Sequence, residues 1–219
     1  MKKQFAVIGL GRFGFAVAAE LERMGYDVLA VDSEEATVES ASAVLSHCVQ
    51  ADCTDEPTIT QLGMKEMDVV IVAVGDTRAS VMVTLLLTEL GVPVIVAKSN
   101  DDIHKKLLEK IGATRIICPE SEMGTRVAHS LVNPGIVDVM DLSRDYRILE
   151  CATPQSWTGQ SLRELDCRRR FNINVIGIRD KQGRITVSPS ADNPLCASDV
   201  LIMLGPTADV TKLERTLAK

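Results

Sequence analysis

The sequence predicts an α/β fold, in which a doubly wound parallel sheet is followed by a small α+β domain. Two observations support this prediction. Up to Asn133-Pro134-Gly135, short apolar runs rich in Val, Ile and Ala alternate with segments of helical period, and after it the pattern changes. Continuous apolar strands separated by helices are typical of a parallel sheet covered on both faces. We therefore expect one domain at residues 1–134 and a second at residues 135–219.

Six strands are expected in the first domain, each a short run of β-branched and small apolar residues. They are Gln4–Gly9, Asp27–Val31, His47–Ala51, Asp68–Val74, Val92–Ala97 and Thr114–Ile117. The helices are expected at Gly14–Met24, Glu34–Leu45, Glu56–Leu62, Ala79–Leu90, Ile103–Lys110 and Ser121–Leu131. Several of them are followed by glycine, which commonly ends a helix: Gly25, Gly63, Gly91 and Gly112.

The second domain is expected to hold four strands and two helices. The strands are Arg147–Ala152, Asn174–Arg179, Arg184–Ser188 and Val200–Leu204, and the helices are Leu162–Arg170 and a last one from Ala208 to the end. A domain of about 80 residues has a marginal core on its own. We therefore expect it to dimerise.

Charge and composition exclude several classes of protein. The net charge of −6 divides into −8 for residues 1–140 and +2 for residues 141–219, so the first part lacks the clustered cations that nucleic acids require. Arg168, Arg169 and Arg170 have no interleaved aromatics and are interpreted as a solvated face. Apolar runs reach about six residues, far short of the roughly 20 that cross a bilayer. With a strand beginning at Gln4, no signal peptide is expected, and we predict a cytoplasmic protein.

The cysteines and histidines give no metal or disulfide signal. The six cysteines contain no C-x-x-C pair, and the three histidines show no metal-ligand spacing with them. His47, His104 and His129 are each interpreted as structural or exposed, and no general acid or base for hydride transfer is found. We predict no catalytic residue and binding without turnover.

The strongest chemical signal is the motif Gly9-Leu10-Gly11-Arg12-Phe13-Gly14 between the first strand and the first helix. In this position Gly9 makes the tight turn, Gly11 lets the backbone approach a pyrophosphate, and Gly14 permits close packing of helix on strand. The helix N-terminus offers N–H groups to the phosphates. Asp32 ends the second strand 23 residues after Gly9 and can accept hydrogen bonds from ribose hydroxyls. Together they predict a Rossmann-like nucleotide-binding domain, and the absence of an Arg directly after Asp32 disfavours NADP.

Further candidates end other strands at the same edge of the sheet, where open α/β sheets bind ligands. They are Asp52 with Cys53 and Thr54 after the third strand, Val74 and Gly75 after the fourth, and Lys98 after the fifth. Asp52 either meets a base edge or caps the next helix. Arg12 can reach a terminal phosphate of its own ligand or of one on a neighbouring subunit. Glu120 either caps a helix or holds a bridging Mg²⁺ or Ca²⁺ near the phosphates.

These residues resemble the cytoplasmic regulatory subunits of bacterial Trk and Ktr potassium uptake systems, built from a regulator-of-potassium-conductance (RCK) domain. The segments that carry the resemblance are Gln4–Gly14, Val28–Asp32, Leu107–Ala113, Pro119-Glu120 and Met123-Gly124. The pattern from residue 141 onward resembles the TrkA-C module of that family, and the single unit favours the Ktr-like type. Two alternatives remain open at this point. One is a small NAD-dependent oxidoreductase, and the other is an NADH-sensing regulator, which would need a helix-turn-helix that is not found.

The resemblance implies an octameric ring, a tetramer of dimers, docked on a membrane potassium transporter subunit at the inner face of the plasma membrane. ATP and ADP would switch the shape of the ring, NAD(H) would share the pocket, and in some relatives cyclic di-AMP would bind the C-terminal domain. The resemblance also implies that Arg12 reaches a neighbour's γ-phosphate and that Glu120 helps hold a divalent cation, Mg²⁺ or Ca²⁺, there.

Overall fold

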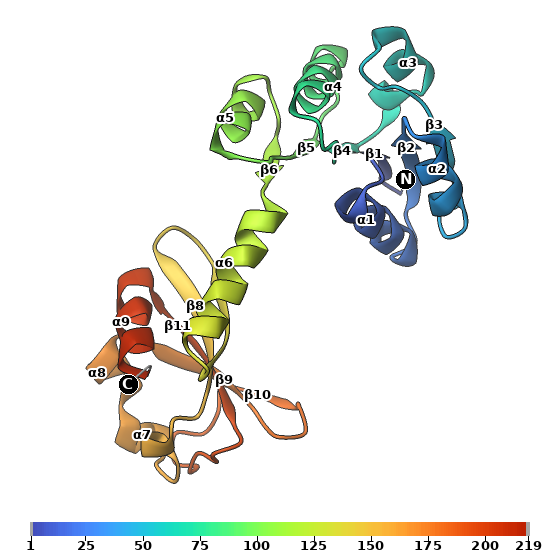
Figure 1. The fold of residues 1–219 in the computed structure, drawn as a ribbon. Helices are drawn as coiled ribbons and strands as arrows, with labels where there is room; N and C mark the ends of the chain where they lie inside the picture. Colours follow the sequence, from blue (N-terminus) through green and yellow to red (C-terminus); the bar gives the residue numbers. More distant parts are fainter. Residues whose placement is uncertain (1, 218–219) are drawn as a thin grey trace. The chain divides into compact units, whose positions relative to one another are not determined.

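The computed structural model of the protein describes residues 2–217 (Figure 1). The chain divides into two compact units, Met1–Glu120 and Ser121–Lys219. This division lies earlier than the boundary that the sequence predicts after Pro134, because most of helix α6 (Pro119–Val132) joins the second unit. Arg126 of this helix donates from Nε to Asp138 Oδ1 at 2.9 Å.

The first unit is a six-stranded parallel sheet with the order β3-β2-β1-β4-β5-β6. Its strands are β1 (Gln4–Ile8), β2 (Asp27–Asp32), β3 (Cys48–Gln50), β4 (Val69–Val72), β5 (Ile95–Lys98) and β6 (Arg115–Ile117). Its helices are α1 (Arg12–Arg23), α2 (Glu35–Ser42), α3 (Glu56–Gln61), the short η1 (Met64–Glu66), α4 (Thr77–Leu90) and α5 (Asp102–Lys110). The short η1 was not expected. Every other strand and helix of the first unit overlaps the range that the sequence predicts, although its first or last residue differs. The strand expected at Val92 begins later, since Pro93 has no N–H for the ladder.

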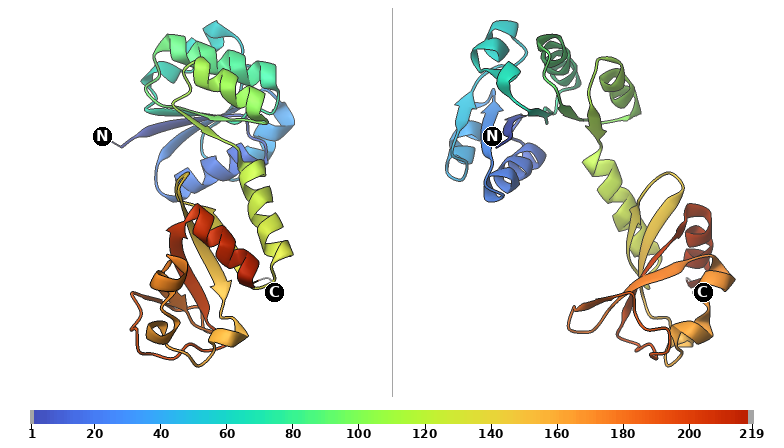
Figure 2. Two further views of the ribbon diagram at one scale, coloured as in Figure 1. Left: turned by 90° about the vertical axis from the view of Figure 1, so that its left-hand side faces the viewer. Right: turned by 180° about the vertical axis from the view of Figure 1, so that it is seen from behind.

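Helices cover both faces of this sheet (Figure 2). One face carries α1 and α2, and the other carries α3, α4 and α5. Successive residues of β1 point to opposite faces: Val7 belongs to the core with Ala18 of α1, whereas Ile8 belongs to the core with Leu87 of α4. All four side chains are buried. The predicted doubly wound sheet is therefore confirmed.

The strand order places a topological switch point in the middle of the sheet. β1 lies between β2 and β4, so the chain first builds outward through β2 and β3 and then returns to build β4, β5 and β6 on the other side. The loops that follow β1 and β4 therefore diverge at the carboxyl ends of these strands, which is where open α/β sheets bind ligands.

The second unit is a five-stranded antiparallel sheet with the order β10-β9-β11-β8-β7. Its strands are β7 (Ile136–Asp141), β8 (Tyr146–Ala152), β9 (Asn174–Arg179), β10 (Ile185–Val187) and β11 (Val200–Pro206). Its remaining helices are η2 (Gln155–Trp157), α7 (Leu162–Leu165), α8 (Cys167–Phe171) and α9 (Thr207–Leu217). The core joins Leu149 and Leu201 of the sheet to Leu213 of α9, which confirms the expected α+β class.

The second unit differs from the sequence prediction in three elements. Strand β7 and the short η2 were not expected. The helix expected over Leu162–Arg170 is divided at Asp166, whose φ of 41° lies in the left-handed region. The last helix begins at Thr207, one residue before the expected Ala208, and is described to Leu217, while the rest of that prediction lies outside the described residues. None of the helices within residues 2–217 is long and apolar enough to cross a membrane.

Candidate nucleotide site at the carboxyl edge of the parallel sheet

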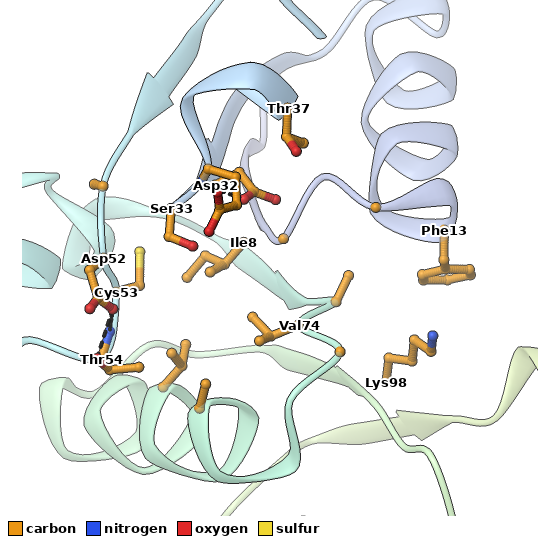
Figure 3. A pocket seen from close by; sticks show the side chains of 18 of the residues that line it. Ile8, Phe13, Asp32, Ser33, Thr37, Asp52, Cys53, Thr54, Val74 and Lys98 are labelled. Atoms are coloured by element: carbon orange, nitrogen blue, oxygen red, sulfur yellow. Dashed lines mark hydrogen bonds between the residues drawn. The ribbon is translucent and has the colours of Figure 1, made fainter. Parts of the chain in front are cut away.

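A cavity of about 440 Å³ opens at the carboxyl ends of the parallel strands in the first unit (Figure 3). Twelve of the thirteen site residues predicted from the sequence line it: Gly9, Gly11, Arg12, Phe13, Asp32, Asp52, Cys53, Thr54, Val74, Gly75, Lys98 and Glu120. The remaining one, Gly14, does not line the cavity. The fold thus brings together residues that are more than a hundred positions apart in the sequence.

The glycine loop owes its shape to close backbone packing. Gly9 has a φ of +93°, and a Cβ on it would lie 2.8 Å from the carbonyl carbon of Ala73. A Cβ on Gly14 would lie 1.8 Å from the carbonyl oxygen of Gly9. Both positions therefore require glycine for the turn and for the approach of α1 to the loop.

Gly11 serves a different purpose, because a Cβ there would meet no atom within 4 Å. This residue is the N-cap of α1, and no side chain caps the helix. The first N–H groups of α1 consequently lack intrahelical or side-chain acceptors, and the space beside them is open. This arrangement suits an anionic group such as a phosphate.

Asp32 ties the end of β2 to the glycine loop. Its Oδ2 accepts the N–H of Leu10 at 2.6 Å and its Oδ1 accepts the N–H of Glu34 at 3.0 Å. Each carboxylate oxygen has a second lone pair, so both can still accept from a ligand hydroxyl. Ser33 and Thr37 also line this side of the cavity. Neither is among the site residues predicted from the sequence, although Ser33 directly follows Asp32.

Asp52, at the far end of the cavity in Figure 3, is held as an acceptor. Its Oδ1 accepts the hydroxyl of Thr54 at 2.7 Å and the N–H of Thr54 at 2.9 Å. These hydrogen bonds lower the pKa of Asp52, and the one from the Thr54 hydroxyl has the larger effect. The capping alternative for Asp52 is wrong, because the N-cap of α3 is Asp55, whose carboxylate accepts the N–H of Thr58 at 3.1 Å.

Cys53 contributes a protonated thiol to the same end. Its side chain is buried, and this burial raises the pKa of Cys53 to about 12, with Asp52 and Asp32 adding to the shift. The thiol is thus a small apolar wall rather than a nucleophile at neutral pH.

The opposite end of the cavity carries the cations. Lys98 Nζ lies 2.5 Å from Glu120 Oε1, and this hydrogen bond is the main cause that lowers the pKa of Glu120. The charge of Arg12 lowers the same pKa further. Within residues 2–217 there is no cluster of three or more His, Cys, Asp or Glu side chains that could hold a metal ion.

The two ends give the cavity a chemical direction. Phe13 and Lys98 lie at one end in Figure 3, and Asp52, Cys53 and Thr54 at the other. The first end, with the open helix N-terminus, suits a polyphosphate, whereas the acidic end suits hydroxyl and amino donors. The cavity lining contains no histidine. His47 is exposed, His104 is buried outside the lining, and His129 belongs to the second unit.

Comparisons with known proteins agree with this geometry. The TrkA-N domain model matches residues 5–119 and the TrkA-C domain model matches residues 151–218. The chain is 40% identical over 217 residues to Ktr system potassium uptake protein C of Bacillus subtilis, which covers 98% of this chain and 97% of the relative. It is 39% identical over 213 residues to Ktr system potassium uptake protein A of the same organism, covering 97% and 96%.

A solved structure adds a liganded relative. The crystal structure of GsuK bound to ADP is 27% identical, covers 59% of this chain and 33% of that one, and superposes with a TM-score of 0.51. The similarity thus concerns a part of a longer protein.

Proposed function

The chain belongs to the family of Ktr and Trk potassium uptake proteins with TrkA-N and TrkA-C domains, and on this premise we propose that it is a nucleotide-gated regulatory subunit of a potassium uptake transporter. The observation that carries the proposal is the polarised cavity at the switch point of the sheet. It places an uncapped helix N-terminus and two cations at one end and carboxylate acceptors at the other.

Adenine nucleotides are the ligands that fit this polarity. The phosphates of ATP or ADP lie at the N-terminus of α1 with Arg12 and Lys98, the ribose hydroxyls donate to Asp32, and the amino group of adenine donates to Asp52. The relative described as bound to ADP supports this choice. NAD(H) can bind through the same glycine loop and Asp32. The acidic Glu34 in the lining would repel the 2′-phosphate that distinguishes NADP from NAD.

The difference between ATP and ADP is the basis of the proposed gating. A γ-phosphate adds negative charge. Arg12 can pair with the γ-phosphate of a nucleotide bound to the same subunit or to a neighbouring subunit. Only a ligand with different affinities for two ring states can shift their balance, and the γ-phosphate supplies that difference. The ring then opens or closes the membrane subunit.

Glu120 alone does not complete a site for a divalent cation. Glu120 is paired with Lys98, and one carboxylate is too few for Mg²⁺ or Ca²⁺, which take six or more oxygen ligands. In the proposal, Glu120 supplies one ligand and the nucleotide phosphates supply others, so that the cation binds only with nucleotide. The cation then neutralises phosphate charge.

Exposed apolar side chains support an oligomer. On α4 and α5 they are Met82, Leu85, Ile103 and Leu107, and on α6 they are Met123, Val127 and Leu131, which recur every fourth residue. Patches of this kind commonly mark protein interfaces. We propose that dimers assemble into an octameric ring on the cytoplasmic face of the membrane subunit. Binding of cyclic di-AMP to the second unit remains part of the proposal.

Calorimetric titration of the nucleotide-stripped protein with ATP, ADP, NAD⁺ and NADH, with light scattering to follow its mass, tests this function. Micromolar binding of ATP and ADP to an octamer is the expected result. Binding of NAD(H) alone to a monomer or dimer would instead favour a small NAD-dependent oxidoreductase or an NADH-sensing regulator. The lining offers little to an oxidoreductase, because Cys53 stays protonated and no histidine is present.

A further inference from the structure

A buried histidine outside the cavity is linked to a cavity loop by two hydrogen bonds. His104, in the first turn of α5, is 1% exposed, and its Nδ1 accepts the backbone N–H of Asn100 at 3.2 Å. The side chain of Asn100 donates from Nδ2 to the carbonyl oxygen of Gly75 at 2.7 Å. Gly75 follows β4 and lines the cavity.

The chemistry of His104 indicates that its role is to accept this hydrogen bond. An imidazole accepts at Nδ1 only when it is neutral with its proton on Nε2. Burial lowers the pKa of His104, although Asp101 opposes this shift, so the ring stays neutral at neutral pH. Nε2 is buried and has no hydrogen-bond partner among the described residues. A leucine would avoid that cost, but it would leave the N–H of Asn100 without an acceptor.

At the other end of the link, Asn100 fixes the orientation of one peptide group. The C=O of Gly75 and the N–H of Asp76 belong to the same trans peptide and point in opposite directions. Asp76 also caps α4 by accepting the N–H of Ala79 at 2.8 Å. A Cβ on Gly75 would meet no atom within 4 Å, so a ligand can approach this backbone closely. A carbonyl that turned toward bound phosphates would repel them.

We propose that His104 is a positioning residue for nucleotide binding, which acts through Asn100 to hold the Gly75 carbonyl and the loop after β4 in the orientation that accepts a nucleotide. This inference rests on the proposed function, since it assumes that the cavity binds nucleotide. His104 itself touches no ligand.

Variants of the full chain separate this role from a merely structural one. Asn100→Ala removes the donor to Gly75, His104→Leu removes the acceptor, and His104→Asn places an amide oxygen close to the position of Nδ1. His47→Leu is the matched control, because His47 is exposed in the same unit. Calorimetry should show that Asn100→Ala and His104→Leu each weaken ADP binding about three- to tenfold, the range expected for the loss of one ordinary hydrogen bond. His104→Asn and His47→Leu should stay within about twofold of wild type.

The double variant Asn100→Ala/His104→Leu tests whether the two residues act in series. If His104 acts through Asn100, the ADP affinity of the double variant should equal that of the single variant with the lower affinity. A loss equal to the sum of both single effects would overturn the proposal. So would a His104→Leu variant that melts at a lower temperature but binds ADP like wild type, since the histidine would then be structural.

Hydrogen exchange without nucleotide separates this inference from the proposed function. Amides of the loop at residues 73–80 should exchange faster in Asn100→Ala and His104→Leu than in wild type, and at the wild-type rate in His104→Asn. If wild type fails to bind ADP while this exchange pattern holds, the nucleotide function is wrong but the loop is still held by His104. If exchange is unchanged in all variants, the positioning role is wrong whatever the ligand.

Discussion

Asp32 Oδ2 and the backbone nitrogen of Leu10 lie 2.6 Å apart, so the carboxylate that ends β2 holds the loop that follows β1. The same side chain accepts a second N–H, from Glu34. Asp32 therefore combines two roles that are usually assigned separately. It shapes the glycine loop before any ligand binds, and its remaining lone pairs are available to ribose hydroxyls.

From these two roles we predict that Asp32→Ala weakens ADP binding by about two orders of magnitude and lowers stability by about 1 to 2 kcal/mol, since two N–H groups lose their acceptor. Asp32→Asn should lose less of both, because its amide oxygen can still accept from one of them. Calorimetry and thermal unfolding measure the two effects. Asp27→Ala, at the exposed start of the same strand, is the control. Unchanged ADP binding in Asp32→Ala would contradict the ribose contact.

Cys53 should be chemically inert despite its place in the cavity. Its pKa of about 12 leaves roughly one thiol in ten thousand ionised at pH 8. We expect iodoacetamide to modify the exposed Cys196 long before Cys53, and mass spectrometry of digested protein gives both rates. Burial also raises the pKa of Cys151, in the second unit, to about 12. The modification rate of Cys151 therefore serves as an internal comparison. Modification of Cys53 as fast as of Cys196 would show that the cavity wall opens in solution.

The residues of the site were largely predictable because most of them are fixed by local chain geometry. The glycine motif and Asp32 occupy positions that the strand-turn-helix unit dictates, and strand ends of a parallel sheet necessarily converge at one edge. The partners of these residues were not predictable. That Glu120 pairs with Lys98, and that Asn100 reaches Gly75, depends on how β5 and β6 are staggered against β4. The sequence pattern does not encode this stagger.

Strand β7 shows a different limit. Its sequence, from Ile136 to Asp141, includes the buried Ile136 and Val139 among polar and exposed positions, but it directly follows Pro134-Gly135, which was interpreted as a domain boundary. Its partner strand β8 pairs with it through a register shift, and such an irregularity weakens any period-based signal. The turn signal before β7 and the irregular pairing of this strand therefore hide it from a sequence-based prediction.

The pair formed by Arg126 and Asp138 should make the second unit sensitive to acid. The hydrogen bond from Arg126 is the main cause that lowers the pKa of Asp138. A lowered folded-state pKa contributes stability that is present above the unfolded value, about 3.9, and that is lost as the pH falls toward the folded value. Below about pH 4, we expect the melting temperature of wild type to fall more steeply with decreasing pH than that of Arg126→Met.

Because Arg126→Met also removes a positive charge from the second unit, it needs a matched control. Arg163→Met serves, since Arg163 forms an exposed ion pair with Asp192 elsewhere in the same unit. Pairs of that kind contribute little to stability. Equal acid profiles for wild type and Arg126→Met, measured by circular dichroism, would mean that the pair does not anchor α6.

Arg12 provides the sharpest test of the gating proposal, because its position separates the two nucleotides. It lines the cavity near Glu120, at the end where the proposed function puts the phosphates. Since ADP already has the helix N-terminus and Lys98, Arg12→Ala should leave ADP affinity nearly intact. It should abolish the difference between the ATP-bound and ADP-bound shapes of the ring, measured by small-angle X-ray scattering. Arg23→Ala, at the far end of α1 and paired with Glu20 on the surface, should retain that difference. If Arg12→Ala instead weakens both nucleotides equally, Arg12 is a general phosphate ligand, and discrimination of the γ-phosphate must come from Lys98, Glu120 or a bound cation.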